Sequence, residues 1–570
     1  MDNQRLFLFL ALGLVVMMLF NAWEDQFNPR QASPESTTTS APATPQDIPQ
    51  AAAVPEPVPG AATTAPVPTA DQNNASASAP AVAGQNIHVR TDLFDVIIST
   101  IGGDIRYAAL PAYPERADNP DKPVQILFER GPFLYVAQSG LLSATAQSVD
   151  HHARFTTQQT EYQLEPGKDS LDVVLHWQDD KGLAVSKTYT FHRNRYVIDM
   201  IVEVSNGGTQ EWSGRLYRQL QRSNEKDPNQ SRFMYTYTGG VVSSPGNKYE
   251  KVKFEDMASW KPEQAFTTGG WAAMVQHYFL SAWIPKQDEA NHFYSSVLNP
   301  PGNAGIEGAG RYILGLQTSE SKIGVGQTGQ FSSQLYIGPK EQQRLETVAP
   351  NLKLTVDYGM LTILAEPVYW LLEKIHGFVN NWGWSIVFVT LIVKLLFYKL
   401  SEAAYRSMAN MRKFQPKLQA LKERYGDDRQ RMSQAMMEIY KKEKINPLGG
   451  CLPMLVQIPV FISLYWVLLE SVELRHADFM LWITDLSSKD PYYVLPLIMG
   501  VSMLIQQRLN PAPVDPVQKK VMQVLPIVFT LFFAFFPAGL VLYWVVNNIL
   551  SILQQWYITR KIEAQSASGK

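Results

Sequence analysis

Long apolar segments in the last third of the chain limit its fold more than any other feature of the sequence. They fall at 380–400, 451–471, 491–508, 521–536 and 538–558. The hydrocarbon core of a bilayer takes about 20 apolar residues of helix, so each segment predicts one crossing. An earlier segment, 1–24, predicts an uncleaved N-terminal transmembrane anchor, with a cleaved signal peptide as the alternative. The expected fold is a polytopic α-helical membrane protein with six transmembrane helices.

The direction of these crossings follows from the basic residues between them. The loop 401–448 holds eleven Lys and Arg against six Asp and Glu, and such an excess marks the cytoplasmic side of a membrane. The short loop 509–520 and the tail 559–570 are also basic. Both termini are therefore expected in the cytoplasm, which places residues 85–345 in the periplasm of a Gram-negative cell.

The composition changes twice before the first of the five clustered crossings. Residues 25–84 are rich in Pro, Ala, Thr and Ser, which predicts a disordered linker. Residues 85–345 carry short alternating segments such as YVIDMIVEVSN, so they predict a large all-β periplasmic domain similar to a β-sandwich. Segment 350–379 predicts an amphipathic helix at the outer membrane boundary, with a core helix of the β-domain as the alternative.

Polar side chains inside the crossings gather in the half nearest the cytoplasm. Thr390, Lys394, Tyr398 and Ser401 recur on one helical face of the segment 380–400. Others are Gln457, Ser502, Gln506, Gln523, Asn547, Ser551 and Gln554. Polar groups without partners are costly in hydrocarbon, so this distribution favours a hydrated hollow that opens toward the cytoplasm. Hydrogen bonding between helices is the alternative explanation.

Lys394 is the most informative of these polar residues. It lies about 10 Å above Ser401 by the helical rise, which is further than a lysine stem reaches. Lys399, on the opposite face, is close enough to the cytoplasmic end to extend to the membrane surface. No Asp or Glu lies in the interior of the five clustered crossings to pair with Lys394. We therefore expect its anion to come from outside the protein.

The basic loop 401–448 has the pattern of a helical hairpin. Its methionines include Met408, Met411, Met432 and Met436. They could form an adaptable contact surface for apolar segments, lipid or ribosomal RNA, or they could simply be the packed seam of the hairpin.

Several chemistries find no support in the sequence. Cys451 is the only cysteine, so an intramolecular disulfide is excluded, and the scattered histidines show no metal-ligand spacing. There is no phosphate-binding glycine loop and no nucleophile elbow. The net charge of −2 gives no global basic field for DNA. We expect no cofactor, no metal and no nucleotide site.

Three long motifs resemble the YidC/Oxa family of membrane protein insertases. They are MRKFQPKLQALKERYGDDRQRMSQAMMEIYKKEKINPLGGCLPMLVQIPVF, SVELRHADFMLWITDLSSKDPYYVLPLIMG and FPAGLVLYWVVNN. The resemblance implies a five-helix insertase core, a β-supersandwich-like periplasmic domain and a location in the bacterial inner membrane. It implies a membrane insertase and chaperone, not an enzyme. The implied partners are nascent membrane proteins, the Sec translocon, the ribosome and membrane lipids, with the signal recognition machinery as a further candidate.

The same resemblance assigns residues to a substrate groove. The intramembrane basic residue of the family falls on Lys394, where arginine is more familiar, so only the simple electrostatic role carries over. Thr390 matches a substrate-contacting threonine. An aromatic contact falls at Trp544, beside Tyr543, where tyrosine is expected at 544. Gln457 and Trp466 match groove-side positions, and Gln506, Asn547 and Ser551 complete the expected groove.

Two other functions remain open at the level of sequence. A channel or transporter for an anionic solute could use Lys394 as its binding charge, although the apolar outer halves of the crossings do not suit a pore. An enzyme could have its active site in the β-domain, but no pair of acids there is distinctive enough to name a site.

Overall fold

The computed structural model describes residues 84–225, 236–298, 310–425, 452–510 and 516–568, together with six positions between 430 and 438. The predicted anchor 1–24 and all but the last residue of the linker 25–84 lie outside the described residues. The chain divides into Met1–Gln46 and Asp47–Lys570, and every element below belongs to the second unit.

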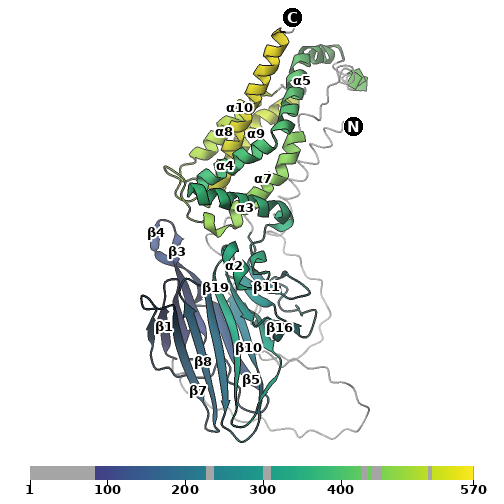
Figure 1. Cartoon of the computed structure of the whole chain (residues 1–570). Coiled ribbons are helices and arrows are strands. Elements are labelled where there is room, and N and C mark those ends of the chain that lie inside the picture. The colour runs from purple at the N-terminus through teal and green to yellow at the C-terminus, as the bar shows by residue number, and fades with distance from the viewer. Residues whose placement is uncertain are drawn as a thin grey trace, which may run out of the picture. The chain divides into compact units, whose positions relative to one another are not determined.

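The first half of the described chain forms two β-sheets (Figure 1). The eleven-stranded sheet runs in the order β13-β16-β17-β10-β5-β4-β3-β2-β1-β6, with β18 paired to β10. Its strands are β1 (Asn86–Arg90), β2 (Asp95–Ser99), β3 (Ile105–Arg116), β4 (Asn119–Arg130), β5 (Phe133–Ser143), β6 (Glu161–Gln163), β10 (Trp212–Ser223), β13 (Thr267–Thr268), β16 (Ala290–Leu298), β17 (Arg311–Thr318) and β18 (Ser321–Ile323).

The eight-stranded sheet runs in the order β12-β11-β14-β15-β19-β9-β8-β7. Its strands are β7 (Ser170–Gln178), β8 (Leu183–His192), β9 (Val197–Asn206), β11 (Gly239–Ser243), β12 (Glu250–Val252), β14 (Trp271–Val275), β15 (Phe279–Pro285) and β19 (Thr328–Pro339). Strand β15 contacts β10 and β4 of the other sheet, so the two sheets share one core.

Alternation of apolar and polar residues explains strands such as β8 and β9. Along β9, Ile198, Met200, Val202 and Val204 are buried, while the residues between them are more exposed, as expected for one buried sheet face. Strand β10 differs because every one of its residues is buried. Its Arg218 donates to Asn291 at 2.6 Å and forms an ion pair with Glu289 at 3.1 Å. Partners at the start of β16 and just before it therefore compensate the buried charge.

The second half of the described chain is helical. Its elements are α2 (Gln342–Val348), η1 (Leu352–Thr355), η2 (Gly359–Leu361), α3 (Thr362–Val379), α4 (Trp382–Leu396), α5 (Tyr398–Tyr425), α7 (Leu452–Glu470), η3 (Val472–Leu474), α8 (Val494–Leu509), α9 (Pro516–Phe533) and α10 (Ala538–Ser568). In Figure 1, α3 lies crosswise to the other helices and packs against α4 and α7. Its Ile363 and Phe378 are 85% and 90% exposed.

The segment 380–400, expected to be one helix, is divided in the structure. Helix α4 ends at Leu396, Phe397 is its C-cap, and α5 starts at Tyr398 after a bend of 67°. Among the described residues no single helix meets the length and hydropathy required for a membrane crossing, whereas the bent pair Trp382–Leu396 and Tyr398–Ala409 meets them together. The polar stripe from Thr390 to Ser401 therefore spans two helices that meet at an angle.

Candidate functional site

A buried ammonium group lies where α4, α5 and α10 meet. Lys394, in the last turn of α4, is 7% exposed, and its Nζ donates a hydrogen bond of 2.8 Å to Oγ of Ser551 on α10. The Ser551 hydroxyl in turn donates to the backbone carbonyl of Asn547 at 2.7 Å. Ser551 therefore accepts a hydrogen bond from Lys394 and donates its own to the backbone of α10.

The first turns of α5 pack against α10 near the Lys394–Ser551 pair. Tyr405 is half-buried in α5, and Ser401 is buried one turn before it in the same helix. Sequence reasoning stopped the polar stripe at Ser401 and missed Tyr405. The signal was available, because Tyr405 lies four residues further along and continues the same helical face.

Among the described residues, Lys394 has no acidic partner. None of the ion pairs found in the described part of the chain includes it, and its only side-chain hydrogen bond there is to the neutral Ser551. A lysine inside a protein usually pairs with a carboxylate, because the attraction offsets lost hydration. Within the described residues, the charge of Lys394 is therefore left without an opposite charge beside it.

The other predicted groove residues lie on several helices. Thr390 is 1% exposed, and its hydroxyl donates to the backbone carbonyl of Ile386 at 2.6 Å. Asn547, Gln457 and Gln506 are half-buried on α10, α7 and α8. Lys399, past the bend, has a side chain that is 92% exposed. The two lysines of this segment thus differ in burial as their positions in the sequence predicted.

Aromatic rings occupy the interface of α7, α9 and α10. Trp544 is half-buried, and its ring packs edge-on to Phe461 with centroids 4.6 Å apart. Phe533 of α9 lies 4.9 Å from the same indole, and Tyr543 is buried against Phe461. Trp466 is half-buried beside Tyr465 on α7. Large flat side chains therefore separate these three helices.

Some polar residues serve helix packing instead. Asn548 donates to Ser502 of α8 at 3.0 Å, and Gln555 donates to Asn510 at 3.0 Å. Asn548 and Gln555 were missed from the sequence, since nothing in a hydropathy pattern shows which helix a polar side chain will meet. For this face of α10, the alternative of hydrogen bonding between helices holds.

Little of the predicted hairpin surface is described. Met408 is half-buried on α5. The side chain of Met411, and Met432 and Met436 as a whole, lie outside the described residues.

Together these features define a two-part class of protein: a large β-rich domain followed by an apolar helical region that buries Lys394 beside the Ser551 hydroxyl. Family models match both parts, with the YidC periplasmic domain covering residues 86–371 and the 60Kd inner membrane protein covering residues 374–565. The chain belongs to the YidC family of membrane protein insertases, with a large β-rich periplasmic domain and a helical C-terminal region.

Relatives match along the whole chain. A membrane protein insertase YidC from Methylococcus capsulatus is 50% identical over 100% of both chains. One from Nitrosococcus oceani is 49% identical over 99% of this chain and 100% of its own. A crystal structure titled as an active YidC insertase with its first transmembrane domain resolved covers 83% of this chain and 95% of its own, at 16% identity and a TM-score of 0.39.

Proposed function

We propose that this chain inserts nascent membrane proteins by giving their polar tails a temporary site beside Lys394. The apolar segment of the incoming protein moves into lipid along α7 and α9, while its short acidic or polar tail occupies the hollow between α4, α5 and α10. Lys394, Thr390, Ser551 and Asn547 form the polar side of this groove. Gln457, Trp466, Gln506, Tyr543 and Trp544 form the remainder.

The observation that carries the proposal is the state of Lys394. Its side chain is 7% exposed and meets a hydroxyl instead of a carboxylate. The attraction between this ammonium group and a client carboxylate about 4 Å away is on the order of 4 kcal/mol at an effective dielectric of 20, before the cost of desolvation is subtracted. Partition of the apolar segment, at about 25 cal/mol per Å², supplies the larger driving force. The lysine lowers the barrier for the tail, and no nucleotide is required.

The proposal includes a topology. Six transmembrane helices at the ranges given above, with both termini in the cytoplasm, place a β-supersandwich-like domain in the periplasm. The exposed apolar residues of α3, among them Ile363 and Phe378, support a position of this helix at the outer boundary of the bilayer. The basic hairpin then faces the cytoplasm, where the ribosome, the signal recognition machinery and the Sec translocon are the proposed partners.

Site-specific crosslinking tests the groove. A photoreactive residue at Thr390, Gln457 or Trp544 is expected to form adducts with a ribosome-stalled nascent membrane protein. The same probe at Ile363, an exposed position on α3, serves as a control for crosslinking that does not depend on the groove. A lack of adducts from all three groove positions would refute the proposal.

The charge is tested separately with a matched pair of lysines. Lys394→Ala is expected to lower insertion of clients with acidic tails at least tenfold, and Lys394→Arg is expected to retain it. Lys399→Ala removes a lysine five residues away whose side chain is 92% exposed, so it should leave insertion unchanged. If Lys394→Ala and Lys399→Ala insert every tested client equally well, the role given to Lys394 is wrong.

A further inference from the structure

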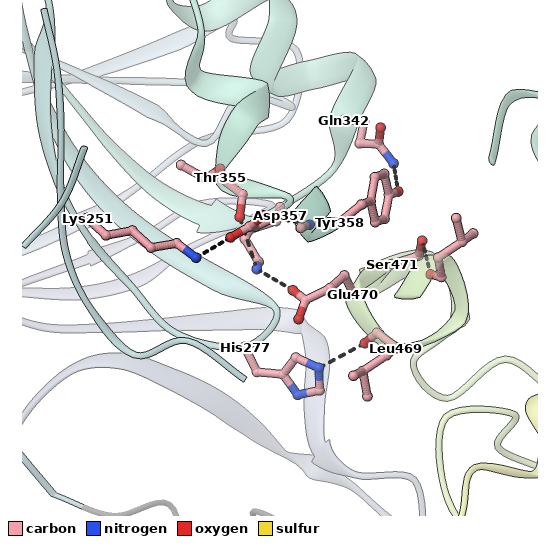
Figure 2. Close-up of polar contacts among 12 residues, drawn as sticks. Lys251, His277, Gln342, Thr355, Asp357, Tyr358, Leu469, Glu470 and Ser471 are labelled. Atoms are coloured by element: carbon pink, nitrogen blue, oxygen red, sulfur yellow. Dashed lines mark hydrogen bonds and ion pairs between the residues drawn. The ribbon is translucent and has the colours of Figure 1, made fainter. Parts of the chain in front are cut away.

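A buried ion pair joins the β-domain to the end of α7. Lys340, which follows β19, places its Nζ 3.0 Å from Oε2 of Glu470, the last residue of α7. The two side chains are only 3% and 6% exposed. Nζ of Lys340 also donates to the backbone carbonyl of Thr355 at 3.2 Å, which ties the pair to η1. Figure 2 shows Glu470 pointing from its helix toward Thr355.

A second contact comes from a different part of the β-domain. His277, in the turn between β14 and β15, places Nε2 2.8 Å from the backbone oxygen of Leu469 (Figure 2). The last carbonyls of a helix have no partner within the helix, so this nitrogen occupies a position that water would otherwise fill. The positive charge of Lys340 also suits the negative end of the α7 dipole. Two separate segments of the β-domain therefore hold one helix end.

The burial of the Lys340–Glu470 pair determines how much the contact between the β-domain and α7 depends on it. An exposed ion pair contributes little because water competes for both partners, whereas loss of one partner from a buried pair leaves an uncompensated charge. Lys353 and Glu346 form an exposed pair in the same region, also 3.0 Å apart, with side chains 41% and 65% exposed. The two pairs share their length and differ in burial, so the second is a matched control for the first.

The part of α7 next to this junction carries predicted groove residues. Trp466 lies four residues before Glu470, and Phe461, which packs on Trp544, lies nine before it. Pro459 interrupts the hydrogen bonds of α7 further back, which weakens the coupling to Gln457. A displacement of the outer helix end would therefore move Trp466 and Phe461 more than it moves Gln457 or any residue of α4.

We infer that Lys340 and Glu470 are positioning residues for insertion, which fix the α7 side of the groove relative to the β-domain. The inference rests on the proposed groove and adds a role for the β-domain in placing one of its walls. Neither residue touches the client. Their effect on insertion passes through the position of α7 and its aromatic residues.

The test compares client adducts from two walls of the groove in the full-length protein, reconstituted in liposomes of bacterial lipid. Photoreactive residues at Trp466 on α7 and at Thr390 on α4 report the two walls. Lys340→Met and Glu470→Gln are each expected to lower the ratio of Trp466 to Thr390 adducts at least fivefold. Lys353→Met should leave the ratio within twofold of the wild type.

Charge exchange separates positioning from simple destabilisation. The double variant Lys340→Glu with Glu470→Lys restores an opposite pair and is expected to recover at least half of the wild-type ratio. Limited proteolysis of the β-domain identifies folded protein in every sample. If folded single variants keep the wild-type ratio, or if the folded double variant stays as low as the single variants, the inference is overturned. Absence of Thr390 adducts in the wild type would instead refute the groove.

Discussion

Glu473 allows a prediction of how stability depends on pH, because the structure sets both the sign and the size of the effect. It lies in η3, directly after α7, and its Oε1 accepts a hydrogen bond of 2.8 Å from the Tyr369 hydroxyl on α3. The residue as a whole is half-buried, but its Oε2 is inaccessible and has no hydrogen-bond partner in the described part of the chain. Burial raises the pKa of this carboxyl from 4.5 to about 7.

The raised pKa fixes how stability depends on pH. Between pH 4.5 and pH 7 the folded state binds a proton on Glu473 that the unfolded state has released. The free energy of unfolding contributed by this group is therefore highest at acidic pH and falls as pH rises through that window. A shift of that size corresponds to about 3 kcal/mol, since one pKa unit is about 1.4 kcal/mol.

Glu473→Gln replaces the carboxyl by a neutral group of the same shape that can still accept from Tyr369. We expect equal stability of variant and wild type near pH 4.5, and a variant more stable by up to about 3 kcal/mol at pH 8. Urea unfolding in detergent micelles, followed by tryptophan fluorescence at several pH values, measures the difference. Comparing the two proteins cancels the titration of all other groups. A stability difference that does not change between pH 4.5 and pH 8 would refute the reasoning.

Two further predictions concern packing. A Cβ added to Gly383 of α4 would clash with the ring of Phe479. Gly383→Ala should therefore lower stability by about 1–3 kcal/mol, measured as a lower midpoint temperature of unfolding in detergent. Gly377→Ala is the control and should not lower it, because a Cβ there meets nothing within 4 Å. In the β-domain, buried Lys187, whose pKa burial lowers to about 8, donates to the carbonyls of Gly102 and Ser139. Lys187→Met should cost about 1–3 kcal/mol for each acceptor left unpaired, measured as faster proteolysis of the β-domain, and a normal digestion rate would contradict it.

The sequence was sufficient to predict local structure where hydrophobic periodicity and burial agree. The alternation from Ile198 to Val204 predicted a strand with one buried face, and β9 has it. The difference in exposure between Lys394 and Lys399 followed from helical spacing, which placed the two side chains on opposite faces. The motifs of the membrane region were long enough to identify the family correctly.

Other features could not be predicted, because they depend on contacts between distant residues. WSGRLYRQLQRS looks too polar for an interior strand, yet β10 is buried throughout, and Arg218 depends on Glu289, 71 residues away. Lys340 and Glu470 are separated by 130 residues. The bend at Phe397 falls in LLFYKL, which contains neither Gly nor Pro, so no local signal marks it.

The hydroxyl beside Lys394 has a consequence for the kinds of tail that the protein can accept. Ser551 accepts a hydrogen bond from Lys394 but does not neutralise its charge, so the proposed groove would keep a positive potential. An incoming tail rich in lysine or arginine would meet repulsion there and stay on the cytoplasmic side, whereas neutral and acidic tails would pass. Membrane proteins keep their basic segments in the cytoplasm, and one uncompensated ammonium group would act as a checkpoint that enforces this asymmetry as each client enters.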